Sequence, residues 1–146
     1  MIEYNKRFKR ITNENINDLS DLISISGSSL NTFRYFENRD INVIKNHILT
    51  VILTVDEIDV AYGHIDMEFD RYWLGIMVIE QQISRGYGNI MMSYLIENCL
   101  LNKLDSIYLS VDINNSGAIS LYKKYDFVEY GIINNNKLIM LRVFTT

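Results

Sequence analysis

The spacing of hydrophobic residues near the start of the chain changes from that of a strand to that of a helix. Residues Lys6 to Ile11 predict a first strand, and Thr12 or Asn13 is placed to cap a helix that follows it. Gly27-Ser28-Ser29 interrupts the helical spacing, which predicts that the helix ends there. The apolar positions of this helix are Ile16, Leu19 and Ile23.

The next segment, Leu30 to Arg39, is dense in aromatic residues and arginine. Asp40 follows it and is suited to cap a helix, because its carboxylate can accept a hydrogen bond from a free backbone N–H. We therefore expect a short helix after Asp40. It would run through Val43, Ile44, His47 and Ile48.

From Leu49 onward the hydrophobic pattern becomes that of strands. The three segments Leu49 to Val55, Val60 to Phe69 and Tyr72 to Ile79 are rich in β-branched and aromatic residues. Asp56 to Asp59 and Asp70-Arg71 separate them and are typical of turns. The pattern predicts an antiparallel meander.

The second half of the chain alternates between strands and helices. A loop that ends in Ser84-Arg85-Gly86-Tyr87-Gly88 leads into a helix with apolar residues at four-residue spacing, notably Met91, Leu95 and Cys99. The order of elements indicates a mixed α+β fold. The remaining elements are a strand over Ser106 to Val111, a helix over Ser116 to Lys124, and a hairpin of Phe127 to Ile133 with Leu138 to Phe144 around Asn134-Asn135-Asn136.

Length, charge and composition narrow the class of protein. A chain of 146 residues predicts one domain over residues 1–146. Its 14 basic and 18 acidic residues give a net charge of −4, which argues against nucleic acid or a membrane surface as a partner. Cys99 is the only cysteine and the two histidines, His47 and His64, stand apart, so we expect no disulfide and no metal site. Without a long apolar run, the expectation is a soluble, cytoplasmic protein.

The loop that ends at Gly88 has the features of an anion site. A strand that runs into a glycine-containing turn and then a helix presents unpaired N–H groups to one point. Gly86 and Gly88 let a ligand approach the backbone, and Arg85 can add a charged contact. Two glycines are also compatible with a merely tight turn. The P-loop signature is absent, and a dinucleotide-binding loop would need a glycine where Met91 stands.

Four segments between about Val60 and Tyr130 together resemble the GNAT acetyltransferase superfamily, whose members transfer an acetyl group from acetyl-CoA to an amine. Val78 lies eight residues before Gly86, and Asn115 lies seven residues before Tyr122, as in the family pattern. Ile83 departs from the usual Gln or Arg, and Asp126 replaces the usual glycine. The segments are Leu74 to Val78, Ile83 to Gly88, Ile107 to Val111 and Asn115 to Phe127.

The resemblance implies a fold and a set of cofactor contacts. The fold would be a GNAT-like, mostly antiparallel sheet of six to seven strands flanked by about four helices. The backbone of one strand would pair with the pantetheine arm of acetyl-CoA, the glycine loop would hold the pyrophosphate, and Asn115 would bind near the thiol end. The residues implied are Ile76, Met77 and Val78 in the strand, Ile83, Ser84, Arg85, Gly86, Tyr87, Gly88 and Asn89 in the loop, and Asn115.

Acetyl transfer needs an oxyanion donor, a proton donor for the thiolate and a neutral amine. A backbone N–H near Val78 would stabilise the oxyanion if the strands diverge there. By the resemblance Tyr122 would be the general acid, although four-residue spacing from Ala118 also fits a core tyrosine. His64 and Asp66 lie on one face of the third meander strand and are candidates for the base. Alternatively, His64 and Asp66 belong to a solvent-exposed polar strip with no catalytic role, or water deprotonates the amine before it binds.

The acceptor has to be inferred from the aromatic segment. Phe33, Arg34, Tyr35 and Arg39 could line a pocket in which arginines meet an anionic group and an aromatic ring stacks on a sugar. Alternatively, the aromatic residues pack in the core and the arginines lie on the surface. We expect an N-acetyltransferase for a small-molecule amine, such as an amino sugar, that acts by direct transfer. A non-catalytic acyl-CoA-binding module and a protein N-terminal acetyltransferase are alternatives, and the C-terminal hairpin could pair in a homodimer.

Overall fold

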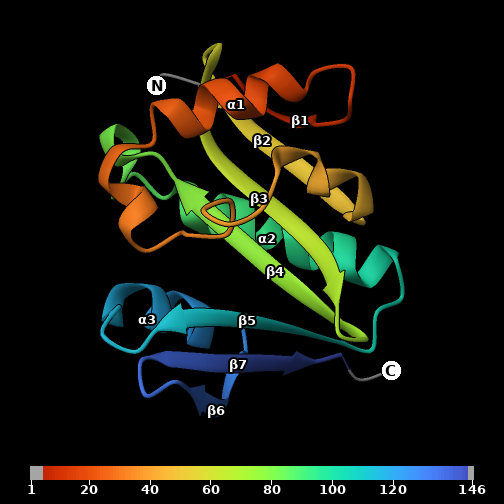
Figure 1. Ribbon diagram of the computed structural model, residues 1–146, viewed down its shortest axis with the longest axis vertical. Coiled ribbons are helices and arrows are strands. Elements are labelled where there is room, and N and C mark those ends of the chain that lie inside the picture. The colour runs from red at the N-terminus through yellow and green to blue at the C-terminus, as the bar shows by residue number, and fades with distance from the viewer. Residues whose placement is uncertain (1–4, 145–146) are drawn as a thin grey trace.

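The computed structural model describes residues 5–144 and contains a seven-stranded, mostly antiparallel sheet with helices on both faces (Figure 1). The order across the sheet is β1-β2-β3-β4-β5-β7-β6. This arrangement confirms the predicted α+β class and the antiparallel meander, which is β2-β3-β4 with β1 added at its edge. The strands are β1 (Lys6–Arg10), β2 (Leu49–Val55), β3 (Ile58–Glu68), β4 (Arg71–Val78), β5 (Ser106–Asp112), β6 (Val128–Ile133) and β7 (Lys137–Val143).

Helix α1 begins later than the sequence predicts. Asn15 is the residue before its first turn, and its side chain points backward, with Oδ1 accepting from Thr12 N at 2.7 Å and Nδ2 donating to Arg10 O at 2.8 Å. Residues 12–15 therefore form a turn, and the predicted cap at Thr12 or Asn13 is wrong. The α-helices are α1 (Ile16–Ser24), α2 (Tyr87–Leu101) and α3 (Ser116–Lys124); the 3-10 helices are η1 (Gly27–Asn31), η2 (Ile41–Asn46) and η3 (Glu80–Gln82).

The predicted cap at Asp40 is confirmed. Its Oδ1 accepts from the backbone N–H of Asn42 at 2.8 Å. The helix that follows, η2, is a 3-10 helix and ends before His47, whose backbone is extended. His47 therefore leaves the helix and is free to turn its ring toward the sheet.

The sheet has a hydrophobic core on each face. Helices α2 and α3 pack on one face, where the predicted stripe of Met91, Leu95 and Cys99 is fully buried. Helix α1 and η2 pack on the other face against Tyr62 and Met77 (Figure 1). The four-residue spacing in α2 therefore correctly predicted the side of this helix that faces the sheet.

Strands β4 and β5 separate along their length, and this separation is the feature of the fold that matters most for the site. They are parallel neighbours, but their only paired residues are Trp73 and Tyr108. Toward Val78 and Asp112 the two strands diverge (Figure 1). The divergence predicted from the sequence is thus present, and the carboxyl-terminal half of β4 has an edge without a strand partner.

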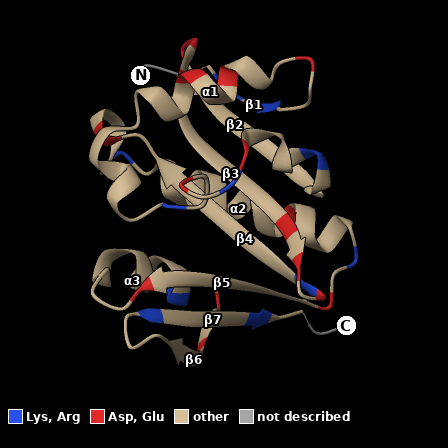
Figure 2. Ribbon diagram, viewed as in Figure 1, with Lys and Arg blue, Asp and Glu red and all other residues tan. Residues whose placement is uncertain are grey.

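Turns at the end of the chain use residues that tolerate left-handed backbone. Asp126, which stands where the family pattern has glycine, has φ +67°, and Asn134 and Asn135 in the β6–β7 turn have φ +55° and +63°. Strand β6 forms the outer edge of the sheet and is exposed along its whole length. Lys and Arg are spread over several elements (Figure 2). In residues 5–144 no helix has the length and apolar character needed to cross a membrane.

Candidate active site

A cleft of about 1450 Å³ connects the two faces of the sheet at the separation of β4 and β5. It is lined by β4, the end of β5, the start of α2, part of α3 and the 32–39 segment. The structure therefore brings together almost all residues that the sequence singled out. These are Phe33, Arg34, Tyr35, Arg39, His64, Asp66, Ile76, Met77, Val78, Ile83, Ser84, Gly86, Tyr87, Gly88, Asn89, Asn115 and Tyr122.

The start of α2 presents backbone donors to this cleft. Gly86 precedes the helix with φ +85°, a left-handed conformation that glycine adopts without strain, and no side chain caps the helix. The first helical hydrogen bond joins Ile90 N to Gly86 O at 3.2 Å. The N–H groups of Tyr87, Gly88 and Asn89 therefore have no partner within the helix, and they lie at the positive end of its dipole. This geometry suits a phosphate or pyrophosphate group.

Arg85 is placed differently from the expectation. It is exposed and does not line the cleft, although its neighbours Ser84 and Gly86 do. A different cation lies next to the helix start, because Lys124 Nζ donates to Asn89 Oδ1 at 2.8 Å. Tyr125 OH also donates to the backbone O of Asn89, at 3.1 Å, and ties α3 to the first turn of α2.

The exposed edge of β4 offers backbone groups to a ligand. Ile79 N donates to Val60 O on β3 at 3.1 Å, and hydrogen bonding alternates along an antiparallel pair. The N–H and C=O groups of Met77 consequently point to β3, whereas those of Ile76 and Val78 point into the separation of the strands. Val78 O already accepts from Ser29 Oγ at 2.6 Å, so the groups left for a ligand on that side are both backbone groups of Ile76 and the N–H of Val78. The backbone groups of Met77 are used in the sheet, so its predicted backbone contact to pantetheine needs correction.

Asn115 and Tyr122 reach the cleft from opposite ends of α3. Asn115 Oδ1 caps the helix by accepting from Ala118 N at 3.2 Å, so its Nδ2 is the group that remains for a ligand. The Tyr122 side chain is packed against Phe127, and burial raises the pKa of its hydroxyl to about 12. Within residues 5–144 that hydroxyl has no hydrogen-bond partner, yet it is not sealed from solvent, which leaves it open to the cleft.

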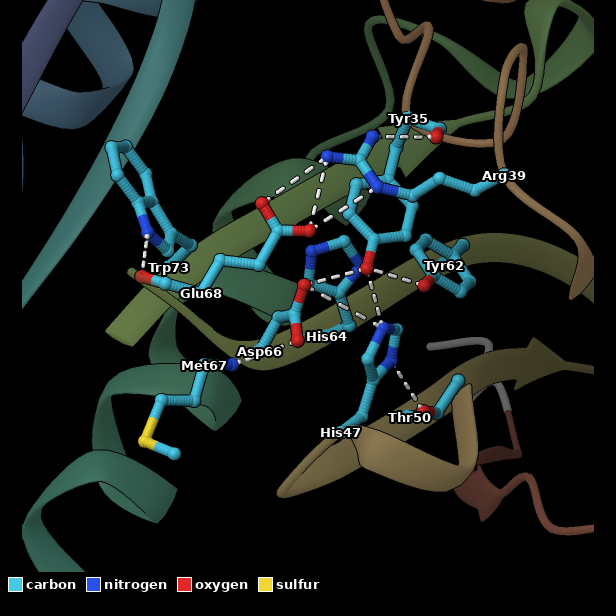
Figure 3. A network of polar contacts seen from close by, with 10 residues as sticks. All are labelled: Tyr35, Arg39, His47, Thr50, Tyr62, His64, Asp66, Met67, Glu68 and Trp73. Carbon is cyan, nitrogen blue, oxygen red and sulfur yellow. Dashed lines mark hydrogen bonds and ion pairs between the residues drawn. The ribbon is translucent and has the colours of Figure 1, made fainter. Parts of the chain in front are cut away.

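On the α1 face of the sheet, polar side chains form one buried network (Figure 3). Tyr35 OH donates to Asp66 Oδ2 at 2.6 Å and lies 2.7 Å from His47 Nε2. His47 Nδ1 lies 2.9 Å from Thr50 Oγ1. His64 and Asp66 are each only 2% exposed, which excludes the alternative of a solvent-exposed strip. Burial is the main cause that lowers the pKa of His47, and it raises the pKa of the Tyr35 hydroxyl.

Both arginines of the predicted acceptor pocket already have acidic partners. Arg34 Nη2 lies 2.8 Å from Asp112 Oδ1, and this ion pair connects the 32–39 segment to the end of β5 across the separation of the strands. Arg39 contacts Glu68 through Nε and Nη2 and stacks over the Tyr35 ring (Figure 3). Glu68 compensates the charge of Arg39, but Arg34 shares Asp112 with Lys137, whose Nζ lies 2.9 Å from Asp112 Oδ1. Two cations and one carboxylate leave a net positive charge at this end of the cleft, so the prediction that Arg34 meets an anionic substrate group remains a prediction.

Comparisons with known proteins agree with this geometry. The model of the acetyltransferase (GNAT) family matches residues 19–127, which is more than half of the chain. This chain belongs to the GNAT family. A search of curated proteins found no match.

Solved structures share the GNAT fold at low sequence identity. The ribosomal-protein-S18-alanine N-acetyltransferase from Escherichia coli has 15% identity and a TM-score of 0.74, with 97% of this chain and 96% of that chain covered. The PaiA N-acetyltransferase from Thermoplasma acidophilum, solved with coenzyme A, has 13% identity and a TM-score of 0.76, with 96% and 99% covered. An N-acetyltransferase from Staphylococcus aureus Mu50 has 11% identity and a TM-score of 0.76, with 95% and 98% covered.

Membership in the GNAT family makes acetyl-CoA the co-substrate, as the sequence predicts. The residues present fit that molecule, because the open start of α2 suits its pyrophosphate and the free edge of β4 suits its pantetheine amides.

Sequence reasoning missed several residues of this site. Trp73 and Asp112 line the cleft, and His47 belongs to the buried network beside it, but none of the three was assigned to the site from the sequence. No local signal in the sequence points to His47, since its partners lie on other elements.

Proposed function

We propose that this GNAT protein is an N-acetyltransferase that transfers the acetyl group of acetyl-CoA to a primary amine of a small molecule by direct transfer in a ternary complex. The observation that carries the proposal is the single cleft that passes from the start of α2, through the separation of β4 and β5, to the buried polar network on the α1 face. Such a cleft allows the thioester to enter from one side and the amine from the other.

Tyr122 is the proposed general acid. Its hydroxyl is open to the cleft, and its raised pKa, about 12, keeps the proton on the oxygen across the range in which the enzyme works. Burial makes the phenol a weaker acid, but a thiolate in the same dry cleft is also destabilised and becomes a stronger base. Proton transfer between the two groups therefore remains feasible.

The proposed step breaks one bond and forms one. The nitrogen lone pair of the amine forms the C–N bond to the acetyl carbon, and the C–S bond breaks with its electron pair left on sulfur. The thiolate sulfur takes the phenolic proton of Tyr122. The nitrogen loses its extra proton to Asp66, whose carboxylate lies on the acceptor side, or to water. Cys99 is not needed as a nucleophile: it is buried, and burial raises the pKa of its thiol to about 12.

The acceptor side suits a polar amine. Phe33, Tyr35 and Trp73 contribute aromatic surface, and Asp66 and Glu68 contribute carboxylates. Arg39 is paired with Glu68, whereas Arg34 and Lys137 share Asp112. Aromatic surface beside hydrogen-bonding side chains suits the ring and hydroxyl groups of a sugar. An amino sugar therefore remains our proposal.

The proposal of a homodimer is kept as well. Strand β6 is an edge strand, and its large apolar residues Val128, Tyr130 and Ile132 are 60%, 53% and 58% exposed. An edge strand with unpaired backbone groups and exposed apolar side chains is suited to pair with a second copy of itself.

The test of function is a screen for release of free CoA from acetyl-CoA with amines, amino sugars and peptides. We expect acetyl-CoA to raise the melting temperature and NAD to leave it unchanged, and we expect turnover with an amino sugar. If acetyl-CoA binds but no acceptor supports CoA release, the protein is a non-catalytic acyl-CoA-binding module. Turnover restricted to peptides would make it a protein N-terminal acetyltransferase and refute the proposed acceptor.

The role of Tyr122 is tested by Tyr122→Phe, with Tyr94→Phe as the matched control. Tyr94 lies on α2 and stacks on Phe8, outside the cleft between β4 and β5. Loss of a general acid lowers kcat by roughly a hundredfold or more. We expect that loss for Tyr122→Phe with little change in the Kd of acetyl-CoA, and no loss for Tyr94→Phe. Equal turnover by both variants would remove Tyr122 from the mechanism.

A further inference from the structure

Tyr62 fixes the position of the ring proton on His64. The Tyr62 hydroxyl lies 2.6 Å from His64 Nδ1, and Tyr62 is fully buried. Among residues 5–144 this hydroxyl makes no other hydrogen bond, so the arrangement that satisfies its single proton has Tyr62 OH donating to Nδ1. Nδ1 accepts this hydrogen bond through its lone pair, so the proton of the neutral imidazole is on the other ring nitrogen, Nε2. His64 thus presents an N–H donor at Nε2.

The donor atom Nε2 is open to the cleft. It has no hydrogen-bond partner in the described part of the chain, and no side-chain nitrogen or oxygen there is both buried and unpartnered. His64 lines the cleft, and it pairs across the sheet with Gly75 of β4. The absence of a side chain at Gly75 provides the room for the ring, because a Cβ at that position would lie 2.5 Å from Nε2.

The contact of the His64 ring with Gly75 also sets an upper limit on the distance between His64 Nε2 and the backbone nitrogen of Ile76. By covalent geometry a Cβ lies roughly 3.3 Å from the nitrogen of the next residue. Added to the 2.5 Å between the ideal Gly75 Cβ and Nε2, this limits the separation of His64 Nε2 and Ile76 N to about 5.8 Å. That is about twice the length of an N–H···O hydrogen bond. One oxygen atom between the two nitrogens can therefore accept from both.

We infer that His64 acts in acetyl transfer as a neutral hydrogen-bond donor to the acetyl carbonyl oxygen, together with the backbone N–H of Ile76, and not as the base. The inference rests on the proposed acetyl transfer. It replaces the base role predicted for His64, because a base needs a free lone pair on the atom that faces the substrate. Asp66 and water remain as proton acceptors.

The surroundings of His64 favour its neutral form. Burial is the main cause that lowers its pKa well below the usual value, and positive charge on His47 and Arg39 acts in the same direction. The His47 ring lies 4.7 Å from the His64 ring and the Tyr35 ring 4.3 Å. The nearest carboxylate, Asp66, is engaged by Tyr35 and by the backbone N–H of Met67. A neutral donor fixed before the reaction is effective because charge on the carbonyl oxygen increases in the transition state.

The proton position can be tested without turnover. In the full chain labelled with ¹⁵N-histidine, NMR distinguishes the two neutral tautomers, and the chain contains only two histidines. We expect His64 to carry its proton on Nε2 in the wild type. Tyr62→Phe should release this preference and populate the Nδ1–H form. A wild-type His64 with its proton on Nδ1 would overturn the inference, whatever the enzyme acetylates.

Kinetics with two variants then separate a donor from a base. Removal of one oxyanion donor typically lowers kcat by 10²- to 10³-fold. His64→Ala should show about that loss with little change in KM, whereas His64→Gln, whose amide nitrogen can replace the Nε2–H donor, should recover at least about tenfold of it. The acid limb of the wild-type pH profile should persist in His64→Gln. Each variant is first checked for binding of acetyl-CoA, which reports that the cleft is folded.

The outcomes distinguish the two proposals. If no amine supports turnover while NMR finds the Nε2–H tautomer, the proposed function fails and the assigned proton position stands. If turnover occurs but His64→Gln is as slow as His64→Ala and both lose the acid limb, His64 is the base and the inference fails. A variant effect confined to the KM of the acceptor would also overturn it, because the residue would then bind the acceptor alone.

Discussion

The two buried histidines predict how the stability of the protein depends on pH. The environment lowers the pKa of His64 well below the usual 6.5 and lowers that of His47 as well. In the unfolded chain both rings titrate near their usual pKa. When the pH falls below about 6.5 the unfolded state therefore binds more protons than the folded state, and the free energy of unfolding decreases.

The size of the effect follows from proton linkage. For one histidine that stays neutral in the folded state, lowering the pH to one unit below the unfolded pKa costs about 1.4 kcal/mol. The wild type should lose about this amount through His64 at about pH 5.5, plus a further loss through His47 that cannot exceed the same figure. Most carboxylates remain ionised in both states at that pH, so their contribution is small.

The measurement is urea denaturation at about pH 8 and about pH 5.5, followed by the fluorescence of Trp73, the only tryptophan. His64→Gln removes one titrating ring and should lose about 1.4 kcal/mol less than the wild type between the two pH values. Lys45→Gln, an exposed substitution in η2, is the control and should follow the wild type. The comparison uses the change with pH, so a difference in overall stability between the variants does not affect it.

Two results would refute the reasoning. An equal loss of stability in wild type and His64→Gln would mean that His64 takes up a proton in the folded state as easily as in the unfolded state. A gain of stability on acidification would mean that the charged ring is favoured, as it would be in an ion pair with Asp66. Either result would also contradict the neutral donor that we infer at this position.

Three further predictions concern other parts of the molecule. Gly88→Val should raise the Kd of acetyl-CoA by about tenfold or more in calorimetric titration, whereas Gly88→Ala should not, because a Cβ there would lie 3.5 Å from Leu121, an ordinary contact. Asp126→Val should lower the free energy of unfolding by about 1–2 kcal/mol because φ is +67°, and equal stability in urea would contradict this. Ile132→Lys on β6 should convert a dimer to a monomer in sedimentation velocity, while Ile25→Lys, at a residue that is 53% exposed, should not; a monomeric wild type would end the dimer proposal.

The elements of the fold were predictable where the signal is local. The three meander strands and α3 were predicted from hydrophobic spacing and lie within two residues of the predicted bounds, and the same spacing predicted α2 without giving its bounds. The start of α1 was not, because Asn15 turns its side chain back to Thr12 and Arg10 and forms a turn first. Whether a polar side chain caps a helix or forms a turn depends on the hydrogen-bond partners that it reaches. The spacing of hydrophobic residues carries no information about those partners.

The two sides of the site differ in how far the sequence predicted them. On the cofactor side the residues that the sequence singled out, from Gly86 to Tyr122, line the cleft, because this side consists of local segments. On the acceptor side the sequence named His64, Asp66 and Tyr35, but it did not decide whether His64 and Asp66 are exposed. Both are buried in a network whose other members lie on separate elements, and their catalytic roles remain proposals.

The sequence by itself determined the local structural features of this protein. A glycine before a helix, a capping asparagine and alternating strands act through neighbours in the chain, so their chemistry can be read from the order of residues. Tertiary structure alone decided the charge state and direction of the side chains. Arg34 pairs with Asp112 across 78 positions, and His64 fits only because the register of β3 and β4 sets it opposite Gly75. Such contacts depend on which strands become neighbours, and burial then fixes the protons that the cleft can donate or accept.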